Sequence, residues 1–569
     1  MSTSIGDHAA TTAARTWIPS IIDRIARFLP RNEVSCSLRV IDKATATFLQ
    51  TPEFTTVRLS EPVPHHAFAW RWGRPGAIRD MTRAQREKLL CLTAASGATA
   101  NLALAARVAG CRPTPEVGYA AGEAGQPGSC ALLAELGCDM GLAGQGAAAG
   151  GHLALCEELM SRRVFAEDMY RAAELSACGQ HAAAAGHTRI LDWVRKRNKR
   201  QCRPLGTVYA WLLIRAIAKG CDLAALQRYH AKLIGPNGAE EEGREAWLGN
   251  LQVGVVAAAA GSPTPDWRAK LEWLESHAFL PTCQAFAAAA KLPDALERLT
   301  WLAQRGYPRR PGDERSKENA PLVAAAAAGN KAAVLYLAEG LPADEDFGDV
   351  WSAAAAKGHL PVLQALHAAG RLGHVRDTAR AAARYGHLHV LRWLVEEALG
   401  LDAVPLDEEL FAAAAASGSV ELMAWLRERG CPWDARAFTA GAASGCVAAL
   451  EWLAERGCPM PDDESPIVDA VKAEDFVVLE CLQRLGCPWG PTGHVFDVCF
   501  EVEDRDQVPM LSWLLAAGCP IDWPTAVKKT TAALDDEMIG TPAQYQASVV
   551  RKRQKDHAWV CAEALRHQR

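Results

Sequence analysis

FAAAAASGSVELMAWLRERGCPWD, residues 411–434, contains one complete copy of the pattern that decides the fold of this chain. The alanine-rich start, residues 411–416, favours a short helix, because alanine has the highest helix propensity and lets neighbouring elements approach closely. Gly418 can end that helix in a left-handed conformation. A second helix is predicted by apolar residues that recur at helical spacing: Val420, Leu422, Met423, Trp425 and Leu426.

The end of this copy is marked as clearly as its beginning. Gly430 is suited to end the second helix, and Pro432 prevents its continuation. Asp434 is placed to cap the first helix of the next copy with its carboxylate. We therefore expect helix, turn, helix and tight loop.

The same pattern returns through the second half of the chain. An aromatic or equivalent residue followed by leucine recurs at intervals of about 27–35 residues, with one double interval: Trp273, Trp301, Tyr336, Trp393, Trp425, Trp452, Cys481 and Trp513. Such self-similarity is typical of stacked repeats that bury their apolar faces against their neighbours. Because these residues lie within the apolar stripe, we expect them in the core rather than in an exposed row of aromatics.

The repeat can be written AAxxGHLxVLxWLxxxG, and Gly-His-Leu opens the second helix at Gly151, Gly358 and Gly386. This pattern resembles the ankyrin repeat over residues 88–520. The resemblance implies an all-α, ankyrin-like helical solenoid of about 14 degenerate repeats. The Thr-Pro-Leu-His opening of that family is missing, and the loop before Phe438 is short, so we expect a tight loop in place of a β-hairpin. A HEAT- or tetratricopeptide-like solenoid is the rival, with longer helices.

The N-terminal stretch WIPSIIDRIARFLPRNEVSCSLRVIDK, residues 17–43, departs from the repeat. It predicts an apolar helix that Pro30 ends, followed by a second helical run. The order of these residues resembles an F-box, and we assign residues 17–57 to an F-box-like helical module. In that family the module docks on the Skp-type adaptor of a ubiquitin ligase. The positions that the resemblance implies for the docking face are Pro19, Ile22, Ile25, Leu29, Pro30, Val34, Leu38 and Val40.

This match to the F-box is imperfect. Ile18 stands where the family usually has its first proline, and Ala44 and Thr45 replace its late tryptophan. Two other interpretations therefore stay open: a fold of this kind without a ligase role, or a polar-faced cap that covers the first repeat.

Composition places the other segments and limits the function. Residues 1–16 are expected to be a disordered tail without a secretory signal, 58–87 a linker, and 521–569 a C-terminal helical cap. No apolar run approaches the roughly 20 residues of a membrane span. The 18 cysteines include four in a repeated Gly-Cys-Pro, about one repeat apart and so too distant for disulfides, and we expect them to be reduced.

Motifs that carry chemistry are missing from the sequence. GLAGQGAAAGG, residues 141–151, lacks the preceding strand of a dinucleotide-binding loop. Its position within the repeat predicts a first helix instead. His65 and His66 have no further ligand nearby at metal-binding spacing. We therefore predict no enzyme, no cofactor and no metal site.

Three features remain as candidate contact sites. Trp433 and Trp489 follow Gly-Cys-Pro in loops, where they could contact a partner, although packing within the loop is the simpler interpretation. The basic run 195–203 could be a nuclear localisation signal or contact phosphates, or it could solvate the end of a helix. The insertion at residues 307–318 could carry a binding function or be disordered.

We predict a protein–protein interaction protein, either a substrate receptor of a ubiquitin ligase or a scaffold without a ligase link. In the first case the module holds the adaptor and the repeats hold an unknown target. The net charge of −5 disfavours nucleic acid as a partner. We expect a monomer in the cytoplasm, the nucleus or both, without a membrane association.

Overall fold

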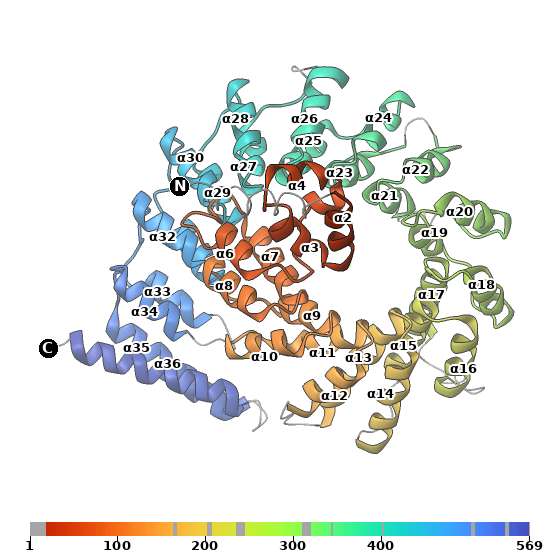
Figure 1. The fold of residues 1–569 in the computed structure, drawn as a ribbon, viewed down its shortest axis with the longest axis horizontal. Coiled ribbons are helices and arrows are strands. Elements are labelled where there is room, and N and C mark those ends of the chain that lie inside the picture. Colours follow the sequence, from red (N-terminus) through yellow and green to blue (C-terminus); the bar gives the residue numbers. More distant parts are fainter. Residues whose placement is uncertain are drawn as a thin grey trace, which may run out of the picture. The chain divides into compact units, whose positions relative to one another are not determined.

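The computed structural model describes residues 19–162, 168–201, 207–234, 245–309, 320–342, 345–400, 403–501, 507–540 and 546–567. The predicted tail, residues 1–16, lies outside them. The described residues form an all-helical protein without strands, in which consecutive helices pack against their neighbours (Figure 1). The all-α prediction is therefore confirmed. The chain divides into two compact units, Met1–Ile78 with Gln85–Leu159 and Arg79–Ala84 with Met160–Arg569.

The first unit begins with a small helical module and continues with helix pairs. The module contains α2 (Pro19–Phe28), α3 (Arg31–Glu33), the π-helical turn η1 (Val34–Leu38), α4 (Lys43–Phe48) and α5 (Pro52–Thr55). It is followed by α6 (His65–Trp72), α7 (Arg83–Ala95), α8 (Thr99–Ala109), α9 (Pro115–Glu123), α10 (Pro127–Glu135), the 3₁₀ turn η2 (Met140–Leu142), α11 (Ala143–Ala149) and α12 (Leu153–Arg162). The glycine-rich stretch at 141–151 is thus helical, and α6 lies within the predicted linker.

The second unit consists of pairs, each with a first and a second helix. The first helices are α13 (Asp168–Ala184), α15 (Thr207–Gly220), α17 (Glu245–Ala260), α19 (Gln284–Ala289), α21 (Ala320–Ala327), α23 (Gly348–Ala356), α25 (Val375–Arg384), α27 (Glu408–Ala416), α29 (Ala435–Ser444), α31 (Ser465–Lys472), α33 (His494–Val498) and α35 (Trp523–Gly540). The second helices are α14 (Thr188–Gln201), α16 (Leu223–Leu233), α18 (Trp267–Ser276), α20 (Ala295–Gln304), α22 (Lys331–Ala338), α24 (Leu360–Ala368), α26 (Leu388–Trp393) with its π-helical continuation η3 (Leu394–Ala398), α28 (Val420–Glu428), α30 (Val447–Glu455), α32 (Phe476–Leu485), α34 (Val508–Ala516) and α36 (Gln546–His567). A short 3₁₀ turn, η4 (Cys499–Glu501), follows α33.

Packing within the second unit follows the pairs. Each first helix contacts the first helix of the next pair, as α25 contacts α27 and α27 contacts α29, and second helices such as α28 and α30 contact each other. Helices α19 to α34 are short, from five residues in α33 to ten in α32. Helices α13, α15 and α17 are longer, at 17, 14 and 16 residues.

The pair formed by α27 and α28 has the local chemistry that its sequence predicts. Gly418 has a φ of 70°, so a residue without a Cβ is required at the turn. Asp434 caps α29, because its carboxylate accepts a hydrogen bond from the Arg436 amide at 3.0 Å. The first helix begins at Glu408, three residues earlier than predicted, because Asp407 caps it by accepting from the amide of Leu410.

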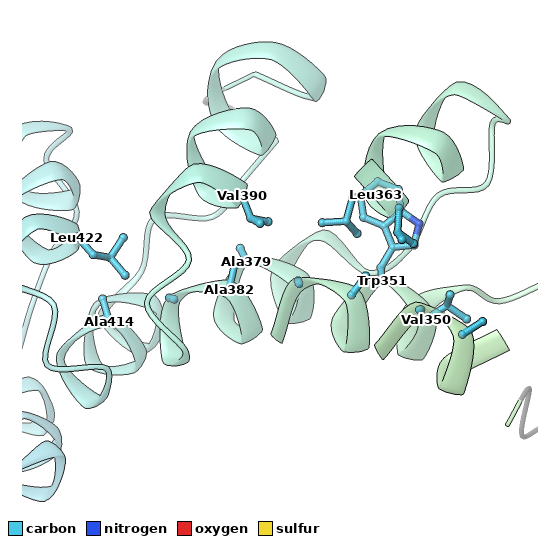
Figure 2. Close-up of a cluster of buried hydrophobic side chains, with 14 of the residues drawn as sticks. Val350, Trp351, Leu363, Ala379, Ala382, Val390, Ala414 and Leu422 are labelled. Carbon is cyan, nitrogen blue, oxygen red and sulfur yellow. The ribbon is translucent and has the colours of Figure 1, made fainter. Parts of the chain in front are cut away.

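The recurring aromatic residues pack on the core of the second unit. Val390 of α26 points toward Ala379 and Ala382 of α25, and Leu422 of α28 points toward Ala414 of α27 (Figure 2). The side chains of Trp393 and Trp425 are buried, with exposed fractions of 6% and 5%. The remaining aromatic members are half-buried and packed against the same core: Trp273, Trp301, Tyr336, Trp452 and Trp513.

Two cysteines of Gly-Cys-Pro connect the end of a pair to its own beginning. The Cys431 thiol contacts the carbonyl of Asp407, and the Cys458 thiol contacts that of Asp434, at 3.4 and 3.6 Å. Asp407 and Asp434 are the N-cap residues of the first helix in the same pair. Burial raises the pKa of Cys431 to about 12 and that of Cys458 to about 11, so both thiols stay protonated. All cysteines among the described residues are free thiols.

A second set of contacts ties each pair to the preceding one. The Nε2 atoms of His359 and His387 lie 3.1 Å from the carbonyl oxygens of Ala327 and Ala356, the last residues of α21 and α23. These carbonyls have no partner within their own helix, because a helix leaves its last acceptors unpaired. The histidine of Gly-His-Leu therefore caps the first helix of the preceding pair.

Other residue types take the same role where histidine is missing. Lys270 donates to the carbonyl of Ala218 at 3.0 Å, and Arg298 donates to that of Ala260 at 2.8 Å. Both cations are buried, Lys270 fully. Lys270 also donates to the hydroxyls of Ser262 and Thr264, at 2.9 and 2.7 Å, so its ammonium group is satisfied despite its burial.

Candidate protein-binding surfaces

The N-terminal module has its own core, which revises the predicted docking face. Ile22, Val34 and Leu38 are buried in that core, together with Ala26 and Leu49. Their side chains hold the module together and are not open to a partner. Ile25 is half-buried against the same core. Pro19 is the first residue of α2, and the structure does not describe its side chain.

The rest of the predicted face is exposed, and sequence reasoning missed further members. Leu29, Pro30 and Val40 are open to solvent, Val40 by 69% of its surface. The additional exposed apolar side chains of the module are Ile21, Phe28, Ile41, Phe48 and Val57, with Phe28 exposed by 80%. Single exposed apolar residues are common, but eight of them in a module of this size offer many apolar contacts to a partner.

The module is fixed to the segment that follows it by one buried side chain. The Asn32 amide group donates to the carbonyls of Arg58, Glu61 and Pro62, and its oxygen accepts from the Arg58 amide. Asn32 is completely buried, so these bonds satisfy both ends of its side chain. The start of the predicted linker is therefore an ordered continuation of the module.

A groove on the second unit is lined by the first helices α25, α27 and α29, with Pro461, Asp463 and Ser465 at or just before the start of α31. It encloses about 790 Å³. Its floor consists of small side chains, namely Ala381, Ala412, Ala413, Ala416, Ala440 and Ala443. Alanine positions on neighbouring helices leave room for side chains of a bound segment, and the apolar floor would exclude water from them.

Alternating charges line this groove. Arg380 of α25 pairs with Asp407 at 3.3 Å and with Glu409 of α27. Arg436 of α29 lies 3.8 Å from the same Glu409 and 2.7 Å from Asp434. Arg384, also in the lining, makes no ion pair with a described residue. The groove therefore offers an apolar floor with fixed polar groups at its margin.

The two loop tryptophans are packed against the core of the second unit. Trp433 and Trp489 are both half-buried. The Trp433 ring lies edge-on to Phe411 and to Trp452, at centroid distances of 5.2 and 6.1 Å, and the Arg427 guanidinium lies 4.1 Å from its centroid. Trp433 and Trp452 line a hollow of about 420 Å³, so part of the Trp433 ring remains accessible.

One surface of the helix pairs is already occupied by the chain. The carbonyl of Arg79 accepts from the amide of Ala448 at 3.0 Å, and its side chain pairs with Glu451. The Arg83 side chain donates to the carbonyl of Ala473. Residues 79–84 thus lie against α30 and the end of α31, about 370 residues away in sequence, and this position was not predictable from the local pattern.

Among the described residues no group of three or more His, Cys, Asp or Glu side chains could hold a metal ion. None of the described helices combines the length and apolar character that a membrane crossing requires. No protein-family model matches the chain, and no curated protein sequence matches it. The surfaces themselves are therefore the basis for any functional proposal.

Proposed function

We propose that this chain is an adaptor-binding interaction protein, in which an F-box-like module recruits a Skp-type adaptor and ankyrin-like repeats hold a target protein. The observation that carries the proposal is the exposure of Phe28, Leu29 and Val40 on a module whose core is complete without them. Side chains of this kind cost free energy in water, and a partner that covers them recovers about 25 cal/mol per Å².

An ankyrin-like solenoid is supported by the geometry of the helix pairs. The helices from α19 to α34 have five to ten residues, whereas HEAT- and tetratricopeptide-like repeats need longer ones. The histidine of Gly-His-Leu caps the preceding pair, which gives this motif a stacking role. In such a solenoid the alanine-floored groove lies on the first-helix face, and we assign the target to it.

Binding of the full-length chain to a purified Skp-type adaptor tests the first half of this proposal. We expect saturable binding by titration calorimetry, and a loss of at least about tenfold in affinity for Phe28→Asp with Val40→Asp, because two buried apolar contacts are worth more than 1.4 kcal/mol. Both residues are exposed, so the substitutions leave the module core intact.

Leu280→Asp is the matched control, since Leu280 is 76% exposed and lies in the second unit. It should bind the adaptor like the unmodified chain. Failure of the folded full-length chain to bind would leave the alternative, a scaffold whose N-terminal helices only cover the first repeat. Equal losses in both variants would show that any added charge disturbs binding, and would remove the assignment to the module.

Peptide selection tests the groove. A random peptide library displayed against the full-length chain should yield related sequences, and Ala440→Arg should abolish their binding by filling the groove floor. Ala368→Arg places the same side chain on an exposed position of α24 and should have no effect. Selected peptides that bind both variants equally would move the target site elsewhere.

A further inference from the structure

Positive charge is concentrated in two adjacent helix pairs of an otherwise acidic chain. Residues 187–234 contain eleven Lys and Arg but only two Asp, Asp192 and Asp222, whereas the whole chain has a net charge of −5. The described part of this stretch forms α14, α15 and α16. The net charge of the whole chain does not reveal a local positive field of this kind. Such a field acts on a partner within about a Debye length of the surface.

Three of these cations gather around one buried ring. Tyr229 of α16 is fully buried. The guanidinium carbons of Arg195 and Arg228 lie 5.3 and 4.7 Å from its ring centroid, and the Lys232 ammonium lies at 5.7 Å. Arg195 comes from α14 and the other two from α16, so the cluster joins the second helices of successive pairs.

The cluster holds only one carboxylate. The Tyr229 hydroxyl donates to Asp192 at 2.6 Å, and Arg195 is 4.0 Å from the same oxygen. No carboxylate of the described residues forms an ion pair with Arg228 or Lys232, and both are exposed. The three cations surround one ring and share one carboxylate, so an anion bound across them would relieve their mutual repulsion.

The chemistry of this face distinguishes between two classes of anionic partner. Protein interfaces place apolar anchors at their centre. The described part of α14 and α16 carries no exposed large apolar side chain. A face whose exposed groups are ionic suits a partner that presents a regular array of phosphates, and arginine matches phosphate geometry especially well.

We propose that the exposed face of α14 and α16 around Arg195, Arg228 and Lys232 binds the phosphate backbone of a nucleic acid without reading its sequence. The aromatic rings nearby, Tyr229 and Trp193, are buried or half-buried beneath arginines and are not free to stack on bases. Contacts to phosphates alone position a nucleic acid but carry no sequence information. This activity is separate from adaptor binding, which uses the first unit.

Fluorescence anisotropy with a labelled 24-base-pair duplex tests the proposal on the full-length chain, in separate DNA and RNA arms and from 50 to 300 mM salt. We expect binding that weakens as salt rises. Arg228→Gln with Lys232→Gln should bind at least about tenfold more weakly at low salt, and its log–log salt slope should be shallower by up to about 1.8, since each DNA phosphate contact contributes about 0.9.

The matched control removes two charges from exposed arginines that already have carboxylate partners, Arg376→Gln with Arg392→Gln. It should retain affinity and slope. The proposal is overturned if neither duplex binds at low salt, or if the two double variants lose affinity equally. It is also overturned if polyglutamate binds while both duplexes do not, because the face would then recognise an acidic protein. Circular dichroism checks that every variant keeps its helix content.

Discussion

The arginine and lysine side chains of the helix pairs from α25 to α32 have different partners from those of the pairs from α13 to α16. In the first region several arginines pair with carboxylates of a neighbouring pair, as Arg429 does with Glu396 and Arg484 with Glu451. In the second region Arg228 and Lys232 have no such partner among the residues that the structure describes. The helices also differ, since α13 has 17 residues and α27 has nine. Charge in the first region joins pairs to each other, whereas we propose that charge in the second region binds a ligand.

The largest effect is expected from a substitution that tests whether the core or the ion pairs contribute more to the stability of the first region. Trp425→Ala removes a buried ring beneath Arg429 and should cost about 3–5 kcal/mol of unfolding free energy. Urea denaturation followed by circular dichroism measures it. Trp70→Ala is the control, because Trp70 is 65% exposed and its loss should cost far less. Equal transitions for Trp425→Ala and the unmodified chain would remove Trp425 from the core.

Substitutions of two lysines compare the buried, hydrogen-bonded Lys270 with the exposed Lys232. Lys270→Met leaves the carbonyl of Ala218 and two hydroxyls without their donor and should destabilise the chain by about 3 kcal/mol. Lys232→Met removes an exposed cation and should change stability by less than about 0.5 kcal/mol. The same denaturation experiment compares them. Similar losses would mean that Lys232 also has a structural role.

Neutralising single charges should have unequal effects on stability in the two regions. Glu409→Gln weakens ion pairs to Arg380 and Arg436 and should lower the unfolding free energy by about 0.5–1 kcal/mol. Arg228→Gln relieves repulsion but also removes a hydrogen bond to the Tyr229 hydroxyl, so it should change the unfolding free energy by no more than a few tenths of a kcal/mol. Both differences should shrink in 1 M salt, because exposed charges are screened. An equal loss of stability in the two variants would contradict the distinction between the regions.

The smallest effect is expected from His387, the histidine that caps α23 in its neutral form. Burial lowers the pKa of His387, and the nearby His389, His359 and Lys357 lower it further, although its bond to Ala356 opposes this. The folded state therefore disfavours the protonated imidazole. Its contribution to stability is present above the unfolded pKa of about 6.5 and is lost as pH falls through the lower folded value. His387→Gln should flatten the stability profile between pH 7 and 5, as measured by thermal unfolding, and an unchanged slope would contradict this assignment.

Features that depend on neighbours in sequence were predictable. Gly418 and Asp434 act on residues within one turn of themselves, so spacing alone identifies their roles. The position of the aromatic residues in the apolar stripe was predictable in the same way, because it follows from the helical period. The inner face of the N-terminal module was not predictable, because α2 has apolar residues around more than one side. Periodicity could not decide between Ile22, which is buried, and Phe28, which is exposed.

Features that depend on distant residues could not be derived in this way. The histidine of Gly-His-Leu was visible as a motif, but its acceptor lies about 30 residues earlier in the chain. The contact of Arg79 with Ala448 links segments that no local pattern relates. The cations around Tyr229 come from two helices, so the basic run at 195–203 revealed only part of the cluster. Lys199 and Arg200 belong to this run, and the structure does not describe their side chains.

The caps that one helix pair places on its predecessor give the chain a direction. His359, His387, Lys270 and Arg298 all reach backward, to a carbonyl at the end of the preceding first helix. A pair at a new C-terminal end would lose its cap, whereas a pair at a new N-terminal end would keep the one that it receives. Duplication or deletion of repeats therefore preserves capping when the segment exchanged contains one donor for each first helix. The unit that can be copied without loss of a cap is one first helix and one donor, wherever in the repeat the segment begins.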